Sequence, residues 1–432
     1  MRTVLKFSSP LIPLQRRGKG QFLELLLIVS ILFISPTVHA TVWKVSEQGK
    51  LNSIKEALQI AKAKDTILVS NGTYREKNIV IEKAIVLLGN NMPVLDGEDQ
   101  FEIITVKSND VVIDGFHFIR SGYSDMAEMA AIRIYYAHKV VVSNSYFDNT
   151  YFGVYNLSSN KCFIINNRFL AKGEDEMKSG NGIHCWHCDS MTIVGNTITG
   201  HRDGIYFEFV TNSVISNNKS IRNVRYGLHF MFSHSNRFDK NIFSGNGSGC
   251  AVMFSHNVTM TNNTFSENWG SASYGILMKE ISDSYVKGNH FSQNTSGIYM
   301  EGTNRIEVLN NNFSKNGTAM RMQASCSGNT ISANNFMSNT FDVATNGSLV
   351  LNVLAGNYWD KYQGYDLDRN GVGDVPFHPI TFYSMLTEQV PEAMMLLHSF
   401  MVTLLDNVEK IIPTITPENF LDEAPVMKPL TT

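Results

Sequence analysis

A segment of about 22 residues recurs along most of this chain, and no other feature restricts its fold as strongly. The unit is clearest at residues 297–316, which read Gly-Ile-Tyr-Met-Glu-Gly-Thr-Asn-Arg-Ile-Glu-Val-Leu-Asn-Asn-Asn-Phe-Ser-Lys-Asn. Alignment on the Asn-x-Phe triplet gives one column, made of Phe147, Phe169, Ile198, Ser220, Phe243, Phe265, Phe291, Phe313, Phe336 and Tyr358. A second, mostly glycine column follows the same period, at Gly153, Gly182, Gly204, Gly227, Gly249, Gly275, Gly297 and Ala319. A fixed period of this length indicates a solenoid.

Alternation within the unit selects the kind of solenoid. Ile298 and Met300 flank the polar Tyr299, and residues 305–308 alternate in the same way, which is typical of strands with one buried face. Residues 100–360 keep no apolar stripe of helical period, and the leucines of leucine-rich repeats are missing. The sequence therefore predicts an all-β, right-handed parallel β-helix over residues 65–360, rising roughly 4.8 Å per coil.

Residues 1–40 have the pattern of a signal peptide. Arg16, Arg17 and Lys19 precede an apolar run over residues 25–34, and residues 38–40, Val-His-Ala, resemble a cleavage site. The run is short for a membrane span, so we expect export to the periplasm rather than an uncleaved anchor. The remaining chain has 31 basic and 38 acidic residues, and such a surface does not suit nucleic acids.

Residues 41–64 are expected to cap the first coil. Ser53 to Glu56 match a capping box, and Ile54, Leu58 and Ala61 would share one face of a short helix. Two coils are lengthened by polar insertions, at about residues 121–129 and 171–179. Such insertions are either tolerated surface loops or the walls of a binding surface.

The outward positions of successive coils carry imidazole and thioether side chains. Because equivalent residues of neighbouring coils lie roughly 5 Å apart, several of them are expected to share one patch. This ligand set suits copper, especially Cu(I), although exposed residues of these types also occur without a function. The candidate copper ligands are His184, His187, His229, Met231, His234, Met253 and His256.

Five cysteines are present, and two of them lie close together. Cys162 and Cys250 fall at inward positions, where a thiol is a small apolar filler. Cys185 and Cys188 lie in the cluster His-Cys-Trp-His-Cys, which permits metal contact, a local disulfide or simple packing. A disulfide would need a bend, because residues three apart on an extended strand are too distant. The sequence leaves their redox state open.

A carbohydrate-active enzyme is the alternative reading of such coils. Hydrolysis requires two carboxylates that face each other across a groove, and the sequence of the coils offers no clear pair. The best acid–base candidate is the triplet His201-Arg202-Asp203 with Glu208 nearby, which is also compatible with a turn and a salt bridge. We therefore expect no catalytic site.

Residues 361–380 differ from the coils. Asp366, Asp368, Asn370 and Asp374 alternate with other residues around Gly371, like the first half of a calcium-binding loop. Phe377 replaces the bidentate glutamate that such loops end on. The segment predicts either calcium binding or a turn closed by its own Asx hydrogen bonds.

Residues 381–432 read as a helix and tail. Residues 392–410 are expected to form one amphipathic helix, and four prolines from Pro413 to Pro429 interrupt the tail, which would lie along a partner or along the solenoid. The apolar, non-repeat character of this part suggests partner docking, through Met394, Met395, Met401 and Met427.

The C-terminal motifs resemble a known family. Residues 356–362 read Gly-Asn-Tyr-Trp-Asp-Lys-Tyr, and residues 364–377 read Gly-Tyr-Asp-Leu-Asp-Arg-Asn-Gly-Val-Gly-Asp-Val-Pro-Phe. The tail carries Pro-Thr-Ile-Thr-Pro at 413–417 and Ala-Pro-Val-Met-Lys-Pro at 424–429. Together with exported coils, these motifs resemble NosD, the periplasmic copper-processing family of nitrous oxide reductase maturation.

The resemblance implies a non-enzymatic accessory role. NosD-type proteins act with an ABC transporter made of a permease and an ATPase, and with a copper-chaperone lipoprotein. They help to provide copper, or sulfur, for the metal sites of apo-nitrous oxide reductase. The resemblance implies transient copper binding but does not identify the ligands, so the ligand set above rests on the residues alone.

Overall fold

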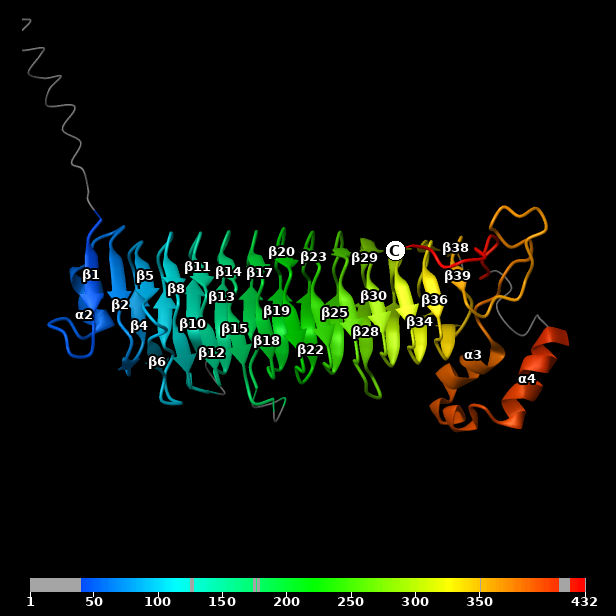
Figure 1. Cartoon of the computed structure of the whole chain (residues 1–432), viewed down its shortest axis with the longest axis horizontal. Helices are drawn as coiled ribbons and strands as arrows, with labels where there is room; N and C mark the ends of the chain where they lie inside the picture. The colour runs from blue at the N-terminus through cyan, green and yellow to red at the C-terminus, as the bar shows by residue number, and fades with distance from the viewer. Residues whose placement is uncertain are drawn as a thin grey trace, which may run out of the picture. The chain divides into compact units, whose positions relative to one another are not determined.

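The computed structural model describes residues 40–124, 128–173, 176, 179–349, 351–411 and 420–431. The predicted signal peptide lies outside the described residues, apart from Ala40, so export stays a prediction. Residues 41–432 form one compact unit in which successive coils stack along a single axis (Figure 1). Each coil adds one strand to each of three parallel sheets, which confirms the right-handed parallel β-helix.

Sheet A has 14 strands in the described part of the chain and begins earlier than predicted, inside the expected cap. Its strands, in order along the stack, are β1 (Val42–Val45), β2 (Thr66–Val69), β5 (Val86–Gly89), β8 (Val112–Asp114), β11 (Val141–Ser143), β14 (Phe163–Ile165), β17 (Thr192–Val194), β20 (Val214–Ser216), β23 (Arg237–Asp239), β26 (Thr259–Thr261), β29 (Ser282–Lys287), β32 (Asn304–Leu309), β35 (Thr330–Ser332) and β38 (Val353–Ala355).

Sheet B has 13 strands among the described residues and carries the aromatic column. Its strands are β3 (Thr73–Tyr74), β6 (Val94–Asp96), β9 (His117–Ile119), β12 (Tyr146–Asp148), β15 (Arg168–Leu170), β18 (Thr197–Thr199), β21 (Lys219–Ile221), β24 (Ile242–Ser244), β27 (Thr264–Ser266), β30 (His290–Ser292), β33 (Asn312–Ser314), β36 (Asn335–Met337) and β39 (Tyr358–Trp359).

Sheet C has 12 described strands, and its outer face carries most of the candidate site. Its strands are β4 (Ile79–Ile81), β7 (Ile104–Val106), β10 (Ala130–Tyr135), β13 (Phe152–Leu157), β16 (Ile183–Trp186), β19 (Asp203–Glu208), β22 (Tyr226–Met231), β25 (Ser248–Met253), β28 (Tyr274–Lys279), β31 (Ser296–Glu301), β34 (Thr318–Met322) and β37 (Phe341–Ala344).

The aromatic column points into the core and stacks from coil to coil. The rings of Phe243 and Phe265 have their centroids 5.3 Å apart, and later neighbours repeat this contact. The sequence alignment placed Tyr358 at the end of this column, but the residue there is Trp359, which stacks on Phe336 at 4.0 Å. Trp359 follows Asn357 by two residues, as Phe336 follows Asn334, so the Asn-x-aromatic triplet and not a fixed step of 22 residues gives the core position.

The asparagine before each aromatic residue forms a buried ladder. Its members are Asn167, Asn196, Asn218, Asn241, Asn263, Asn289, Asn311, Asn334 and Asn357. The Asn263 side chain shows the pattern: its Nδ2 donates to Oδ1 of Asn289 at 3.0 Å, and its Oδ1 accepts the Asn241 side chain at 3.0 Å and the Asn241 backbone N–H at 2.9 Å. The Asn263 Nδ2 also donates to the carbonyl of Phe238 in the preceding coil at 3.0 Å, so the buried amide is satisfied by the coils on both sides.

The two ends of the stack are closed by different devices. Helix α2 (Ile54–Ile60) covers the first coils, and its N-cap Ser53 accepts the backbone N–H of Glu56, as the sequence predicted. At the other end the described tail residues 420–431 run back along the last coils, where Figure 1 shows the red segment. Asp422 ends the asparagine ladder, because its Oδ2 accepts the backbone N–H and the Nδ2 of Asn357 at 3.0 and 2.9 Å.

The C-terminal helical part departs from the expected single helix over 392–410. It consists of α3 (Phe382–Gln389), the 3-10 helix η1 (Pro391–Leu396) and α4 (Phe400–Ile411). Pro391 cannot continue α3, since its ring occupies the place of a donor N–H. His398 has a positive φ of 64°, which interrupts the helical conformation a second time, before α4.

The ladder predicts a large cost for a single buried amide. Asn263→Ala should lower the free energy of unfolding by roughly 2–5 kcal/mol, because at least two N–H groups of Asn241 lose their acceptor inside the core. Chemical denaturation of the purified protein measures this difference. Thr264→Ala, at the half-buried first residue of the adjoining strand β27, is the matched control and should change the free energy of unfolding by less than about 1 kcal/mol. Equal effects of the two substitutions would contradict the structural role of the ladder.

Candidate metal centre

The seven candidate copper ligands lie on or beside the outer face of sheet C, but they do not form one patch. Strands β16, β19, β22 and β25 pair in register, so one outward row reads Trp186, Glu208, Met231 and Met253. Met231 and Met253 are direct partners in this register and both are half-buried. Their thioethers therefore project side by side from neighbouring strands, at a strand spacing of roughly 4.8 Å.

His184 and His229 point outward from the same sheet but are covered, which corrects the expectation of an open patch. Both are only 6% exposed. Nδ1 of His184 lies 3.1 Å from Nδ2 of Asn181, and its ring packs between Tyr155 and Tyr206. Burial lowers the pKa of His184 to about 3, so this imidazole is neutral across the physiological range.

His229 belongs to a buried ionic network rather than to the methionine pair. Its Nδ1 lies 3.3 Å from Oδ2 of Asp203, and Arg225 pairs with the same carboxylate at 2.6 Å. Burial opposes ionisation of Asp203, but the hydrogen bonds from His229 and Arg225 keep the pKa of its carboxyl below the ordinary value. The Asp203 carboxylate therefore holds the His229 ring in place.

His234 and His256 form a second pair beyond the corner of the coil. Their rings stack in parallel with centroids 3.9 Å apart, and the backbone N–H of His256 donates to Nδ1 of His234 at 3.3 Å. Burial and the nearby His256 lower the pKa of His234. These two candidate ligands therefore lie together, while their role in metal binding stays a prediction.

An aromatic column at the corner separates the two pairs and was missed by the sequence reasoning. It consists of His187, Phe209, Phe232 and Phe254, each with a φ between 48° and 54° and each stacked on the next. All four side chains are exposed. The signal was available, because each residue lies five positions after a glycine of the repeat. His187 is consequently stacked on Phe209 and is not directed at the other imidazoles.

The candidate ligands thus form two separate pairs: the thioethers of Met231 and Met253, and the imidazoles of His234 and His256. In the part of the chain that the structure describes, no three His, Cys, Asp or Glu side chains gather closely enough to hold a metal ion. The methionine pair, in contrast, offers two thioethers, and such ligands select Cu(I) over harder cations. A site with two ligands suits transient binding of a metal ion better than permanent binding.

The cysteine side chains are buried in the coils, and Cys185 and Cys250 belong to the sheet C strands β16 and β25. All five described thiols are free and buried. The positive φ of His187 supplies the bend that the sequence argument required. The Cys188 thiol donates to the carbonyls of Asn156 and Trp186, and Cys185 Sγ accepts the Asn156 side chain at 3.5 Å. Burial and the neighbouring Cys188 raise the pKa of Cys185, whereas the proximity of Cys185 lowers the pKa of Cys188. This pair faces the core and is not part of the outward metal candidates.

The acid–base triplet is closed off from a substrate. His201 and Asp203 are both 0% exposed, and burial lowers the pKa of His201 to about 4. Glu208, on the outer row, accepts a hydrogen bond from the Tyr206 hydroxyl at 3.1 Å. The side chains of Asp203 and Glu208 therefore serve a buried ion pair and a surface hydrogen bond.

The calcium-like loop closes on itself through its own carboxylates. Asp366 accepts the backbone N–H groups of Asn370 and Gly371 at 3.1 and 2.9 Å. Asp374 accepts the N–H of Leu367 at 2.6 Å, and Asp368 accepts Nδ2 of Asn370 at 2.9 Å. These bonds favour the self-capped Asx turn over a calcium site, and calcium binding itself stays a prediction.

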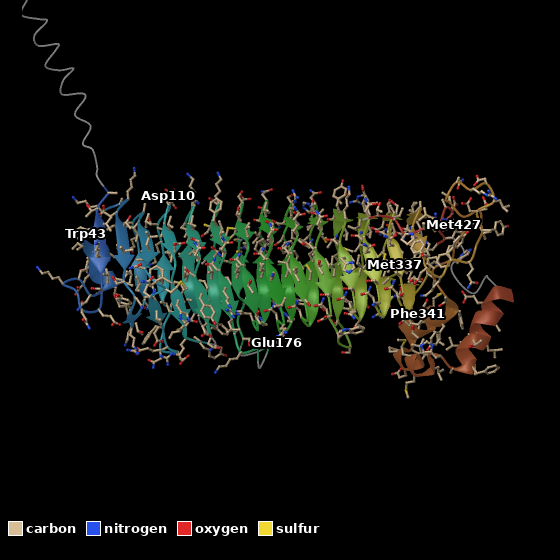
Figure 2. All side chains as sticks on the ribbon, in the orientation of Figure 1. Trp43, Asp110, Glu176, Met337, Phe341 and Met427 are labelled. Carbon is tan, nitrogen blue, oxygen red and sulfur yellow. The ribbon has the colours of Figure 1, made fainter. Side chains whose placement is uncertain are left out.

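The predicted docking residues divide into two groups. Met394, Met395 and Met401 are exposed on η1 and α4, and Met395 reaches 89%. Met427 is half-buried, and its backbone N–H donates to the carbonyl of Gly371 at 3.0 Å. Figure 2 shows Met427 at the end of the stack opposite Trp43. Of the two expectations for the tail, residues 420–431 thus follow the second and lie along the solenoid.

Comparison with known proteins agrees with the motif resemblance. A family model described as "Periplasmic copper-binding protein (NosD)" matches residues 170–364. Two curated relatives are each named "Probable ABC transporter binding protein NosD": one from Pseudomonas aeruginosa, 34% identical over 73 residues, and one from Stutzerimonas stutzeri, 29% identical over 112 residues. These alignments cover 17% and 25% of this chain and span 17% and 26% of the relatives' own length.

Solved structures support the fold alone. A GH87 α-1,3-glucanase catalytic unit from Streptomyces thermodiastaticus superposes with a TM-score of 0.57 at 13% identity, covering 71% of this chain and 65% of that one. The surface adhesin PfbA of Streptococcus pneumoniae superposes with a TM-score of 0.52 at 12% identity, covering 65% and 85%. In the described residues, no helix is long and apolar enough to cross a membrane.

Proposed function

We propose that this NosD-like protein is a periplasmic accessory factor that receives or presents copper for assembly of the metal sites of nitrous oxide reductase. The observation that supports this most is positional. The segment matched by the copper-binding family model, residues 170–364, contains all seven side chains that the sequence nominated as copper ligands. In this proposal copper is cargo, taken from a copper-chaperone lipoprotein and passed to the apo-reductase.

The methionine pair is the proposed point of entry for Cu(I). Met231 and Met253 are register partners, half-buried, and next to the exposed rings of Phe232 and Phe254. Thioethers keep their ligand character at any pH, and the neighbouring rings limit access of water to the ion. The stacked His234 and His256 are proposed as a second binding position for copper, beyond the turn that follows the sheet C strands.

An ABC transporter is the proposed membrane partner, as the names of both relatives suggest. The surface that would meet its permease is the apolar one on η1 and α4. Met395 and Phe400 are 89% and 81% exposed there, and Met401 and Leu404 extend the same surface. Exposed apolar patches of this kind mark sites of protein association. The ATPase would then act on the complex from the other side of the membrane.

Copper binding by the methionine pair can be measured by Cu(I) titration against a chromophoric Cu(I) chelator. The double variant Met231→Leu/Met253→Leu should bind Cu(I) at least about tenfold more weakly, because leucine keeps the volume and removes the sulfur. Met337→Leu, half-buried on β36 of another sheet, is the matched control and should leave the affinity unchanged.

The wider ligand set is tested in the same assay. Replacing His229, Met231, His234, Met253 and His256 together should abolish Cu(I) binding. An unchanged stoichiometry in that variant would show that copper binds elsewhere and would remove the proposed site.

The docking surface gives a separate prediction. Met395→Ser with Phe400→Ser should weaken binding to the detergent-solubilised transporter at least about tenfold, because both side chains are exposed and would become buried only in the complex. Biolayer interferometry measures this affinity. Val214→Ser on β20 is the control for the loss of exposed apolar area. These point substitutions are sharper than truncation, since removing the tail would also remove the buried Asp422. Full binding by the double variant would contradict this docking surface.

A further inference from the structure

The Cys185 and Cys188 thiols lie together inside one coil, where the proposed function gives them no role. Cys185 is 0% exposed and Cys188 is 3% exposed, and both belong to the main core cluster. The proposed copper ligands lie on the outer face of sheet C, so the two thiols are separate from them. Two reactive side chains in one coil therefore need an explanation of their own.

The backbone at His187 turns both cysteine side chains to the same side. On a straight strand, residues three apart point to opposite faces, and Cys185 and Cys188 would diverge. Strand β16 instead ends at Trp186, and His187 has a φ of 51°, in the left-handed region. Because of this bend, both thiols point into the core.

One residue of the preceding coil contacts both sulfur atoms. Asn156 is the register partner of Cys185, and its Nδ2 donates to Cys185 Sγ at 3.5 Å. The Cys188 thiol donates to the backbone carbonyl of the same Asn156, also at 3.5 Å. The two sulfur atoms thus border one residue, and their mutual effect on pKa agrees with their being neighbours.

The third thiol of this region, Cys162, is turned away from the pair. Its Sγ donates to the carbonyls of Ala137 and Asn160 at 3.7 and 3.4 Å. Ala137 belongs to the preceding coil, whereas Cys188 belongs to the following one. The geometry therefore favours a pair made of Cys185 and Cys188.

A serine would be sufficient for the local structure at position 188. Ser159, Ser233 and Ser255 occupy the equivalent corner position of other coils, and each hydroxyl donates to the carbonyl two residues earlier, at 2.9 Å. The Cys188 thiol makes the same bond to Trp186 at 3.4 Å. The hydrogen bond thus does not require sulfur, which leaves the neighbouring Cys185 as the feature that distinguishes this coil.

We infer that Cys185 and Cys188 form an intrachain disulfide when the chain folds in an oxidising compartment. The oxidant is another disulfide, R–S–S–R, of a protein or of the glutathione type. One cysteine thiolate attacks it and forms a mixed disulfide, and the second cysteine then displaces R–S⁻. In total, the two thiols give up two electrons and two protons, and one R–S–S–R becomes two R–SH.

Burial of the pair is compatible with this chemistry, because the exchange takes place before the coils close around the corner. The closed coil then shields the bond from reductants, and the structure shows the pair in its dithiol form. The bond would join the end of β16 to the corner at His187, where the exposed aromatic column begins. The inference rests on the proposed periplasmic location, since cytosolic thiols stay reduced, and it does not depend on copper binding.

Differential thiol labelling of the full chain recovered from the periplasm tests the bond directly. The protein is unfolded with N-ethylmaleimide and a Cu(I) chelator, then reduced and treated with iodoacetamide. Peptide mass spectrometry should find the second label on Cys185 and Cys188. The first label is expected on the internal controls, which are the buried thiols Cys162, Cys250 and Cys326.

Two results of this labelling would overturn the inference. The first label on Cys185 and Cys188 would show that the thiols were free or had held copper. A bond between Cys162 and Cys188 would show that the pairing is wrong. If the chain is not exported, the proposed location fails, and the same labelling after refolding of the reduced chain in a glutathione redox buffer decides the bond.

Cys188→Ser removes the bond and keeps the corner hydrogen bond of the other coils. In the native protein, a reductant should raise the equilibrium constant for unfolding about tenfold, because the unfolded chain regains the freedom of the closed loop. In Cys188→Ser the reductant should have no effect, whereas the matched control Cys250→Ser should keep the native response. Equal responses of the native protein and Cys188→Ser would contradict the disulfide.

Discussion

Pairing between neighbouring coils is the interaction on which this molecule depends. A strand of three residues has no stability of its own, and it exists here because it lies between two equivalents in a parallel sheet. The asparagine ladder adds a second row of bonds inside the turns, with Nδ2 to Oδ1 distances of about 3.0 Å from Asn218 to Asn357. Because side chain and backbone of each asparagine both bond to the next coil, a shift of one residue would break every turn. Asp422 then ends the ladder with a group that only accepts hydrogen bonds.

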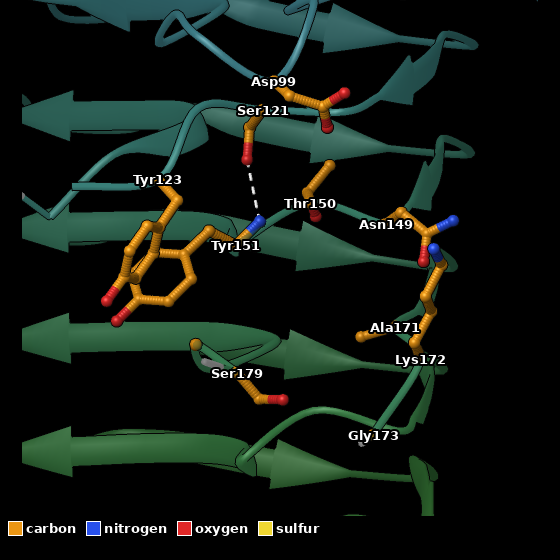
Figure 3. A pocket seen from close by; sticks show the side chains of 11 residues that line it. Asp99, Ser121, Tyr123, Asn149, Thr150, Tyr151, Ala171, Lys172, Gly173 and Ser179 are labelled. Carbon is orange, nitrogen blue, oxygen red and sulfur yellow. Dashed lines mark hydrogen bonds between the residues drawn. The ribbon is translucent and has the colours of Figure 1, made fainter. Parts of the chain in front are cut away.

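The fixed register also produces the surface features. It makes Met231 and Met253 neighbours although they are a full coil apart in sequence, and it stacks His234 on His256. The same rule brings residues 121 and 123 of the first insertion and residues 171–173 of the second to one corner, where they border a hollow (Figure 3). The coils thus act as a scaffold on which function is determined by what each repeat places at a given position.

The sequence was sufficient for the repeat, the sheets and the pairing of equivalent residues, because these follow from a period that can be counted. The sequence reasoning failed where side chains from other coils determine the surroundings of a residue. His184 and His229 occupy outward positions as predicted, yet Tyr155, Tyr206 and Asp203 from other coils cover them. Trp359 and not Tyr358 lies in the core because it follows the ladder residue Asn357 by two positions, whereas a step of 22 residues from Phe336 gives Tyr358. The break at His398 depends on a backbone conformation that no composition rule indicates.

The central claim is that thioether sulfur on the outer face of sheet C holds copper. X-ray absorption spectroscopy at the copper edge of the Cu(I)-loaded protein tests it most directly, since it distinguishes sulfur from nitrogen and oxygen neighbours. The account predicts sulfur scatterers in the native protein and their loss when Met231 and Met253 are both leucine. A first shell of nitrogen and oxygen alone, or a sulfur shell that survives this change, would contradict it.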